Sequence, residues 1–169
     1  MQMVIDGLHE KSLRDAAKQV RKFKDDFIQK NRTFVQELTK LGIQVIYDHL
    51  NGYGDSDYPE PSNPHVLMGI RDGVMQATLR LRGEDVAFVE FGAGVHYNGT
   101  GSPHPLGVEL GYTIGSYGHG QGTQDHWWYG DENGKTVISY GTEATMPLYS
   151  ADLKIRQQFI SIAKSVFGG

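Results

Sequence analysis

A single apolar stripe in the first third of the chain constrains the fold more than any other feature of the sequence. Hydrophobic residues recur there at steps of three, four and seven, and mostly Lys, Arg, Asp and Gln lie between them. The stripe consists of Leu13, Ala16, Val20, Phe23, Phe27, Phe34, Leu38, Leu41 and Val45. This spacing is typical of one face of an α-helix, so we predict a helix over residues 8–50.

Polar and small residues mark the ends of this predicted helix and its weak points. Ser12 is expected to cap its start, with Asp15 three residues on, where an acid favours the N-terminal dipole. Residues 29–33 interrupt the stripe and predict a kink or break, and Gly42 is a second weak point. The Asn-Gly pair of residues 51–52 ends the helix.

The predicted helix is long for the size of the chain. About thirty of its residues alone would span ~45 Å, whereas a compact chain of 169 residues has a diameter of about 40 Å. Either the helix bends near Asn31 or part of its stripe packs on another subunit, and the sequence leaves both open. In the second case Val20, Phe27 and Phe34 would lie in an interface.

The middle of the chain predicts β-structure. Residues 51–65 form a connector, because three prolines and two glycines break both regular periods. Strands follow at 66–71 and 74–82, joined by the Asp-Gly turn of residues 72–73, and apolar residues alternate with Thr and Arg in the second strand. A further strand is expected over residues 86–91.

Glycine-rich sequence and a second amphipathic segment occupy the last part of the chain. Residues 92–126 are rich in Gly, His, Tyr and Ser, so we expect a long loop. A hairpin follows, with strands at 126–129 and 135–140. An apolar stripe then predicts a last helix over residues 150–167, capped by Ser150.

Together these elements predict an α+β protein that forms a single domain over residues 1–169. Its parts are a long N-terminal helix, an antiparallel β-sheet over residues 66–149 that carries the long Gly-rich loop, and a C-terminal helix. A chain of this length buries roughly 70% of its unfolded surface, so it can hold a core without disulfides or metals.

Composition and charge exclude several classes of protein. The chain has no Cys, which rules out disulfides, thiol catalysis and thiolate metal sites. Its net charge of −4 argues against non-specific binding of nucleic acid, which needs a positive surface, although it does not exclude a local basic stripe. We expect no direct sequence-specific binding of nucleic acid. No apolar run approaches the ~20 residues that span a bilayer, and the first residues lack the charged start of a signal peptide. We therefore expect a protein made in the cytoplasm that does not contact a membrane.

Two glycine patterns resemble catalytic motifs but have the wrong spacing. Residues 130–136 (Gly-Asp-Glu-Asn-Gly-Lys-Thr) have one residue too few between the glycines for a phosphate-binding P-loop, and a strand follows where a helix should. Residues 115–118 are one residue short of the nucleophile elbow of hydrolases. We predict neither a nucleotide site nor a catalytic serine from these patterns.

The histidine-rich loop supports the main alternative function, a metal-dependent hydrolase that uses residues 96–126. Four of the seven histidines fall there, and two acids could add a carboxylate ligand. These residues are His96, His104, Glu109, His119, Asp125 and His126. The histidine spacings match neither a pair of metal ligands on one helix face nor a short metal-binding loop. We therefore expect these histidines to be ordinary polar residues of the loop, and we assign no metal or cofactor.

Glu90 is an acid inside an otherwise apolar run. On a strand it would share the face of Phe88. It could be an active-site acid in an apolar setting, or a structural acid that pairs with Arg80 or Arg82 across the sheet. We favour the structural pairing.

Trp127 and Trp128 are adjacent, so on a strand they point to opposite faces. One is expected in the core and the other at the surface. An exposed Trp is a common anchor for a protein partner, so we add this pair to the candidate interface.

Several runs, in their order along the chain, resemble one family of phage proteins. They are residues 88–94 (Phe-Val-Glu-Phe-Gly-Ala-Gly), 102–105 (Ser-Pro-His-Pro), 127–129 (Trp-Trp-Tyr) and 144–148 (Ala-Thr-Met-Pro-Leu). Together they resemble the tail-component family of siphophages, which includes head–tail joining and tail-completion proteins. The resemblance covers residues 74–167. It implies that Glu90, Phe91 and Gly92 form the end of the family's signature strand. It also implies that Pro147 leads into the last helix.

The resemblance implies a virion assembly protein that is not an enzyme and has no catalytic residues. Members of this family are similar to subunits that form a homo-oligomeric ring between the tail tube and the head connector. The implied partners are copies of the chain itself, the head connector and the major tail proteins. The implied location is the tail and neck of the virion, after assembly in the host cytoplasm.

Overall fold

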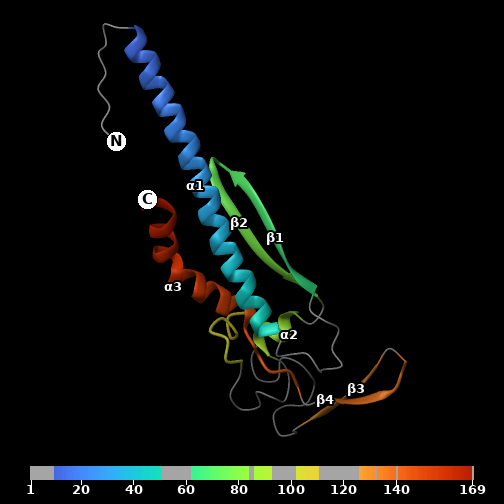
Figure 1. The fold of residues 1–169 in the computed structure, drawn as a ribbon. Helices are drawn as coiled ribbons and strands as arrows, with labels where there is room; N and C mark the ends of the chain where they lie inside the picture. Colours follow the sequence, from blue (N-terminus) through green and yellow to red (C-terminus); the bar gives the residue numbers. More distant parts are fainter. Residues whose placement is uncertain are drawn as a thin grey trace.

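The computed structural model describes residues 10–50, 62–83, 86–92, 102–110, 126–131, 133–139 and 141–168. Its elements are α1 (Glu10–Leu50), β1 (Ser62–Arg71), β2 (Val74–Arg82), α2 (Val86–Phe91), β3 (Trp127–Gly130), β4 (Thr136–Ser139) and α3 (Pro147–Phe167). The long N-terminal helix, the antiparallel strands and the C-terminal helix confirm the predicted α+β class (Figure 1). No described helix combines the length and the hydropathy needed to cross a bilayer.

α1 is one uninterrupted helix of 41 residues, about 60 Å long. The break predicted at residues 29–33 is therefore wrong. Gln, Lys and Arg in this stretch are strong helix formers, and the side-chain amide of Asn31 donates a 2.8 Å hydrogen bond to the carbonyl oxygen of Phe27 in the same helix. The helix begins at Glu10, so Ser12 lies inside the first turn and not at the cap position.

α3 packs antiparallel along the C-terminal part of α1 (Figure 1). As α3 advances, its contacts move backwards along α1: Ile155 lies beside Gly42, Phe159 against Phe34, and Phe167 against Phe27. The rings of Phe34 and Phe159 meet edge to face with centroids 5.1 Å apart, a favoured aromatic geometry. Because α3 ends beside Phe27, it covers the apolar stripe from that residue onwards.

The predicted first hairpin is confirmed. β1 and β2 pair antiparallel with Arg71 opposite Val74, and both turn residues have positive φ, 53° at Asp72 and 77° at Gly73. This is the backbone of a two-residue type I′ turn. β1 begins at Ser62, so its first residues overlap the predicted connector, whose earlier residues lie outside the described part of the chain.

Gly42 is the point at which α1 approaches both of its neighbours. A Cβ atom placed there would lie 2.5 Å from Cδ1 of Leu79 on β2 and 3.0 Å from Cδ1 of Ile155 on α3. Real Cβ contacts are longer than these distances. The close approach of the three elements therefore leaves room only for glycine at position 42. The predicted weak point of the helix is its tightest packing contact.

Residues 86–91 form a helix, and the predicted strand is wrong. A short apolar run without alternation does not distinguish a strand from a buried helix. The helix α2 buries Val89 and Glu90 side by side. It ends at Gly92, whose φ is 75° and whose N–H donates a 2.7 Å hydrogen bond to the carbonyl oxygen of Phe88, an arrangement that terminates helices.

The second predicted hairpin is confirmed as β3 and β4, which form their own two-stranded sheet. The single sheet expected over residues 66–149 is therefore two separate hairpins. Asp131 holds the turn, because its Oδ1 accepts hydrogen bonds from the N–H groups of Asn133 and Lys135, and Gly134 has a φ of 73°. In Figure 1 this hairpin stands at the end of the molecule opposite the start of α1.

α3 begins at Pro147, three residues before the predicted cap. Met146 occupies the cap position with φ and ψ of 51° and makes no side-chain capping bond. Pro147 suits the first helical position because its missing N–H would have no partner there. Ser150 lies inside the first turn, where its N–H donates to the carbonyl oxygen of Met146.

Within the described residues, the buried hydrophobic residues are few and small. They are Ala16, Ile46, Val89, Ala144 and Ala151. Large hydrophobic residues that are more than one third exposed are more numerous and occur on α1, α3 and both hairpins.

We expect Gly42→Val to lower the free energy of unfolding by about 2 kcal/mol, because the added methyl groups would force Leu79 and Ile155 apart. The matched control is Lys40→Val at an exposed position of the same helix, which should cost roughly 0.5 kcal/mol through helix propensity alone. Urea unfolding followed by circular dichroism measures both. Equal midpoints for the two variants would contradict the close packing at position 42.

Candidate functional site

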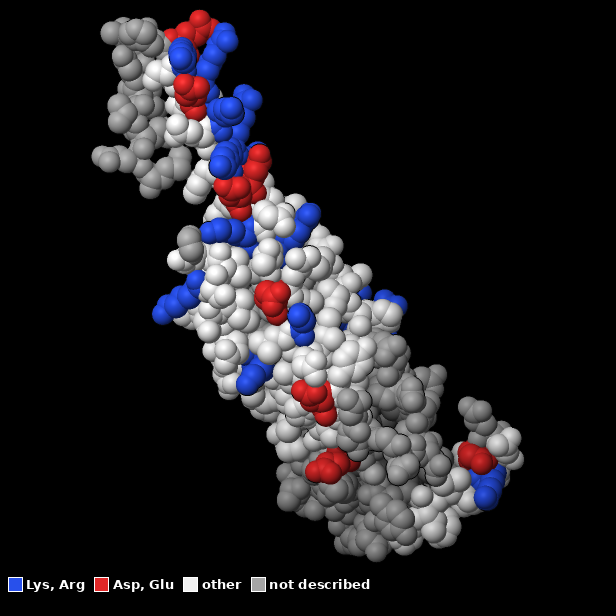
Figure 2. All heavy atoms as spheres, in the orientation of Figure 1, with Lys and Arg blue, Asp and Glu red and all other residues white. Residues whose placement is uncertain are grey.

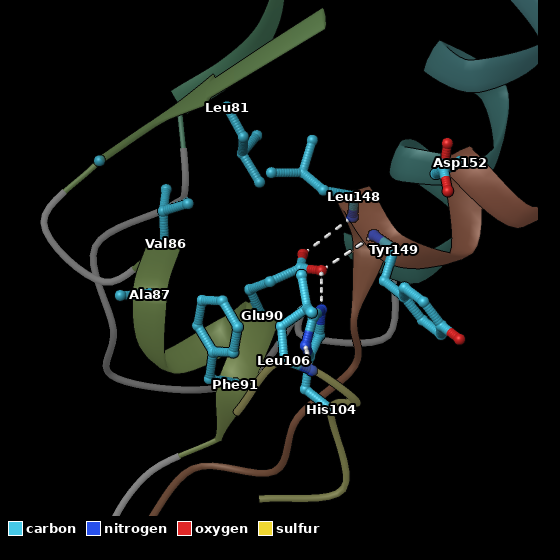
Figure 3. A pocket seen from close by; sticks show the side chains of 11 residues that line it. Leu81, Val86, Ala87, Glu90, Phe91, His104, Leu106, Leu148, Tyr149 and Asp152 are labelled. Atoms are coloured by element: carbon cyan, nitrogen blue, oxygen red, sulfur yellow. Dashed lines mark hydrogen bonds and ion pairs between the residues drawn. The ribbon is translucent and has the colours of Figure 1, made fainter. Parts of the chain in front are cut away.

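Glu90 links α2 to the start of α3. Its side chain is only 4% exposed, and Figure 3 shows its carboxylate pointing at the first turn of α3. Oε2 accepts a 2.8 Å hydrogen bond from the N–H of Leu148, and Oε1 accepts one of 2.9 Å from the N–H of Tyr149. The first N–H groups of a helix have no partner within the helix and attract negative charge. Glu90 therefore caps α3 from another element.

The partners of Glu90 correct the prediction from the sequence. A structural pairing with Arg80 or Arg82 assumed that Glu90 lay on a strand of the same sheet. Because residues 86–91 form a helix, the carboxylate turns away from the hairpin and towards α3. The carboxylate accepts hydrogen bonds from two backbone N–H groups, and its Oε1 also lies close to Nε2 of His104.

His104 is the second buried polar residue of the site, 6% exposed. Its Nε2 lies 3.3 Å from Oε1 of Glu90, and its Nδ1 accepts a 3.1 Å hydrogen bond from the N–H of Leu106. A nitrogen that accepts a hydrogen bond carries no proton, so the ring proton sits on Nε2 and points at the carboxylate. This assigns the neutral tautomer from the hydrogen bonds.

The segment around His104 folds tightly against α2. Ser102 donates its hydroxyl to the carbonyl oxygen of Phe91 over 2.5 Å and accepts the N–H of His104 at 3.2 Å. The N–H of Gly107 donates to the carbonyl oxygen of His104 at 2.8 Å, which closes a turn. The rings of Phe91 and Tyr149 lie against the imidazole with centroids 4.5 and 5.0 Å away. We call Glu90, Ser102, His104, Leu148 and Tyr149 the Glu90 clamp.

Backbone hydrogen bonds attach the chain before α3 to α2 and to the end of α1. The carbonyl oxygen of Val89 accepts the N–H groups of Thr145 and Met146 at 2.9 and 3.3 Å. Nδ1 of His49, in the last turn of α1, lies 2.7 Å from the carbonyl oxygen of Thr145. Three segments that are distant in sequence are thus held together beside the Glu90 clamp.

A cleft of about 610 Å³ opens beside the clamp, and its walls are mostly apolar. The residues that line it are Leu81, Gly83, Val86, Ala87, Glu90, Phe91, His104, Leu106, Leu148, Tyr149 and Asp152. A general base needs a free lone pair that can reach the proton of a substrate. Both oxygens of Glu90 accept hydrogen bonds from N–H groups of α3, and the two ring nitrogens of His104 lie against Glu90 and the N–H of Leu106.

The four signature residues taken from the family resemblance lie around one point. Glu90 is the acceptor of the clamp, Phe91 packs on His104, and Gly92 ends α2 in the left-handed conformation. Pro147 is fully buried at the first position of α3. The sequence order that suggested the family therefore corresponds to the junction between α2 and α3.

The candidate interface residues do not share one environment. Val20 and Phe27 are about half exposed, and Trp128 is 60% exposed on β3. Phe34 packs between Phe159 and Phe167 of its own chain, so it does not belong to the uncovered surface. The side chain of Trp127 lies outside the described residues.

The histidines predicted as possible metal ligands are not brought together where the structure describes them. His104 belongs to the Glu90 clamp, and the ring of His126 contacts Trp128 with centroids 5.7 Å apart. His96 and His119 lie outside the described residues, as does Asp125. Among the residues that are described, no three His, Asp or Glu side chains form a group that could hold a metal ion.

The sequence holds one local signal for the clamp. Ser102 and His104 stand two residues apart, with Pro103 between them and Pro105 after them, a pattern that favours a tight turn closed by side-chain hydrogen bonds. The connection of this turn to Glu90 has no local signal. It depends on packing between segments that lie far apart in the sequence.

Comparison with known proteins gives no neighbour for this chain: no family model, no curated protein and no solved structure matches it.

We expect Glu90→Ala to lower the free energy of unfolding by roughly 3 kcal/mol, because the N–H groups of Leu148 and Tyr149 would be left buried without an acceptor. His104 would also lose its partner. The matched control is Glu109→Ala at an exposed position, which should change the unfolding free energy by less than about 0.5 kcal/mol. Guanidinium unfolding measures both, and a Glu90→Ala protein as stable as the control would argue against the clamp.

Proposed function

We propose that this chain is a non-catalytic subunit of a tailed-phage virion, which completes the tail and joins it to the head. In this role copies of the chain form a ring between the tail tube and the head connector. The proposal draws on the family resemblance, whose signature residues Glu90, Phe91, Gly92 and Pro147 fall together at the junction of α2 and α3.

The observation that carries the proposal is the amount of apolar surface left uncovered on separate elements. On α1, Phe23 is 61% exposed; on the first hairpin, Ile70 is 66% exposed; and on the second hairpin, Trp128 is 60% exposed. A small core flanked by several apolar surfaces is the expected design of a subunit that meets more than one neighbour. A ring subunit between two other structures has at least that many contacts.

The distribution of charge favours protein partners. Figure 2 shows Lys, Arg, Asp and Glu crowded together along the protruding part of α1, whereas the described residues of the body carry few charges on this face. Lys and Arg outnumber Asp and Glu there by eight to four over residues 10–32. The sparsely charged body resembles the central part of a protein interface.

The clamp supports a structural role over the alternative of a metal-dependent hydrolase. That alternative needs His104 as a free ligand or base. In the structure the two ring nitrogens of His104 lie against Glu90 and the N–H of Leu106, and the rings of Phe91 and Tyr149 pack on the imidazole. No observation within the described residues favours the hydrolase.

Deletion of the gene from the phage that encodes it tests the proposal. Electron microscopy of the lysate should show filled heads and separate tails in place of joined virions, with a loss of infectious titre. A plasmid copy of the wild-type gene should restore joining, which controls for effects on neighbouring genes. Joined virions at normal titre in the deletion strain would refute the proposed role.

A further inference from the structure

Basic side chains form a row along one side of the first part of α1. Figure 2 shows Lys and Arg gathered along this protruding end of the helix. The row consists of Lys11, Arg14, Lys18, Arg21 and Lys22, and all five are exposed. Because successive residues of a helix turn by about 100°, these five fall within an arc of roughly 100° around the axis of α1. We call them the basic row.

The apolar residues of the same stretch lie on the other side of α1. Val20, Phe23 and Phe27 are roughly opposite the basic row. That side already has contacts within the chain, since Ala16 is only 9% exposed and Phe27 packs on Phe167 of α3. The basic row stands clear of this packing, so another molecule can contact it without disturbing the contact between α1 and α3.

Acidic side chains neutralise only a small part of the basic row. Glu10 forms an ion pair with Arg14, Asp15 lies at the edge of the row, and Asp25 follows one turn beyond it. The other four cations of the row form no ion pair within the described residues. Over about 16 Å of helix, the row therefore presents four cations that have no acidic partner among those residues.

The charge of this end is opposite to that of the rest of the chain. Residues 10–24 hold six Lys or Arg and two acids, a net charge of +4. The other residues hold ten Lys or Arg and eighteen acids, a net charge of −8. Such an asymmetry is typical of a segment that meets a polyanion. The acidic remainder would repel a polyanion, and α1 carries the basic row beyond α3 and the first hairpin (Figure 1).

A DNA backbone matches the basic row better than a lipid surface does. Along the helix axis the row carries about one cation per 4 Å, and each strand of a DNA duplex carries one phosphate per about 3.4 Å. A helix that lies on a bilayer must instead bury a continuous apolar side. On α1 the burial of Ala16 and the contact of Phe27 with Phe167 interrupt that side.

We propose that the basic row is a contact surface for the phosphate backbone of double-stranded DNA. The Lys ammonium and Arg guanidinium groups donate hydrogen bonds to phosphate oxygens, which carry no sequence information. The contact is therefore independent of base sequence. This inference goes beyond the proposed tail function and does not rest on it, because the row would bind DNA in the isolated protein.

Fluorescence anisotropy of a labelled DNA duplex of about 20 base pairs, titrated with the full-length protein, tests the contact. When about four phosphates are neutralised, the logarithm of the binding constant should fall with the logarithm of salt concentration with a slope of roughly −3.6. The affinity should thus drop about 150-fold between 50 and 200 mM salt. A second duplex of unrelated sequence should bind equally well.

A double variant, Lys18→Ala with Lys22→Ala, removes two cations from the basic row. It should bind the duplex at least about tenfold more weakly, with a salt slope smaller in magnitude by about 2. The matched control is Lys40→Ala with Lys154→Ala, which makes the same change of net charge at exposed positions away from the row. It should keep the wild-type slope. Ala is the strongest helix former, so both proteins should keep their helical circular dichroism.

Four results would overturn the proposal. The first is no binding of the duplex at low salt, and the second is equal weakening of binding in the two double variants. The third is tighter binding to vesicles of phosphatidylcholine and phosphatidylserine than to DNA, which would assign the row to a lipid surface. The fourth is salt-sensitive self-association that requires Lys18 and Lys22 and excludes DNA, which would assign the row to the acidic body of another copy.

The gene deletion and the DNA titration test different statements. Joined virions in the deletion strain would refute the tail function while DNA binding by the isolated protein persists. Loss of DNA binding would refute the contact surface while the deletion still separates heads from tails. The two outcomes are therefore distinguishable.

Discussion

The Glu90 carboxylate determines how the lower end of the molecule in Figure 1 is held together. α3 begins without a side-chain cap of its own, and its first N–H groups find their acceptor on α2. Once this bond is made, α2 must lie across the start of α3, and the turn that carries His104 must lie beneath both. The backbone bonds between Val89 and residues 145–146 then fix the approach to α3.

Local signals predicted most of the fold because most of its elements are determined locally. The stripe of α1 needs only helical spacing, and each hairpin is set by a turn whose glycine tolerates positive φ, Gly73 in the first and Gly134 in the second. The break expected near Asn31 did not occur, since strong helix formers surround that residue and its amide bonds within the helix. Propensity outweighed the interruption of the apolar pattern.

The site was less predictable because its bonds join segments far apart in sequence. Glu90 caps a helix that starts 57 residues later, as the step from Glu90 to Pro147 shows, and no local pattern reports such a partner. The same bond explains why α3 needs no cap at Ser150. The apolar run of residues 86–91 was compatible with a strand or a helix, and tertiary contacts selected the helix. The four positions named from the resemblance lie at this junction, but the resemblance carried no geometry for them.

α1 packs on the rest of the chain near its C-terminal end, and its first part extends beyond α3 and the first hairpin (Figure 1). A small rotation at the packed end therefore gives a larger displacement at the other end. Its last turn bonds to the carbonyl oxygen of Thr145 through His49, and Gly42 is wedged between β2 and α3. Over a rod of about 60 Å, a rotation of one degree at the anchored end moves the tip by about 1 Å. Small adjustments of packing around Gly42 would therefore produce larger displacements at the tip.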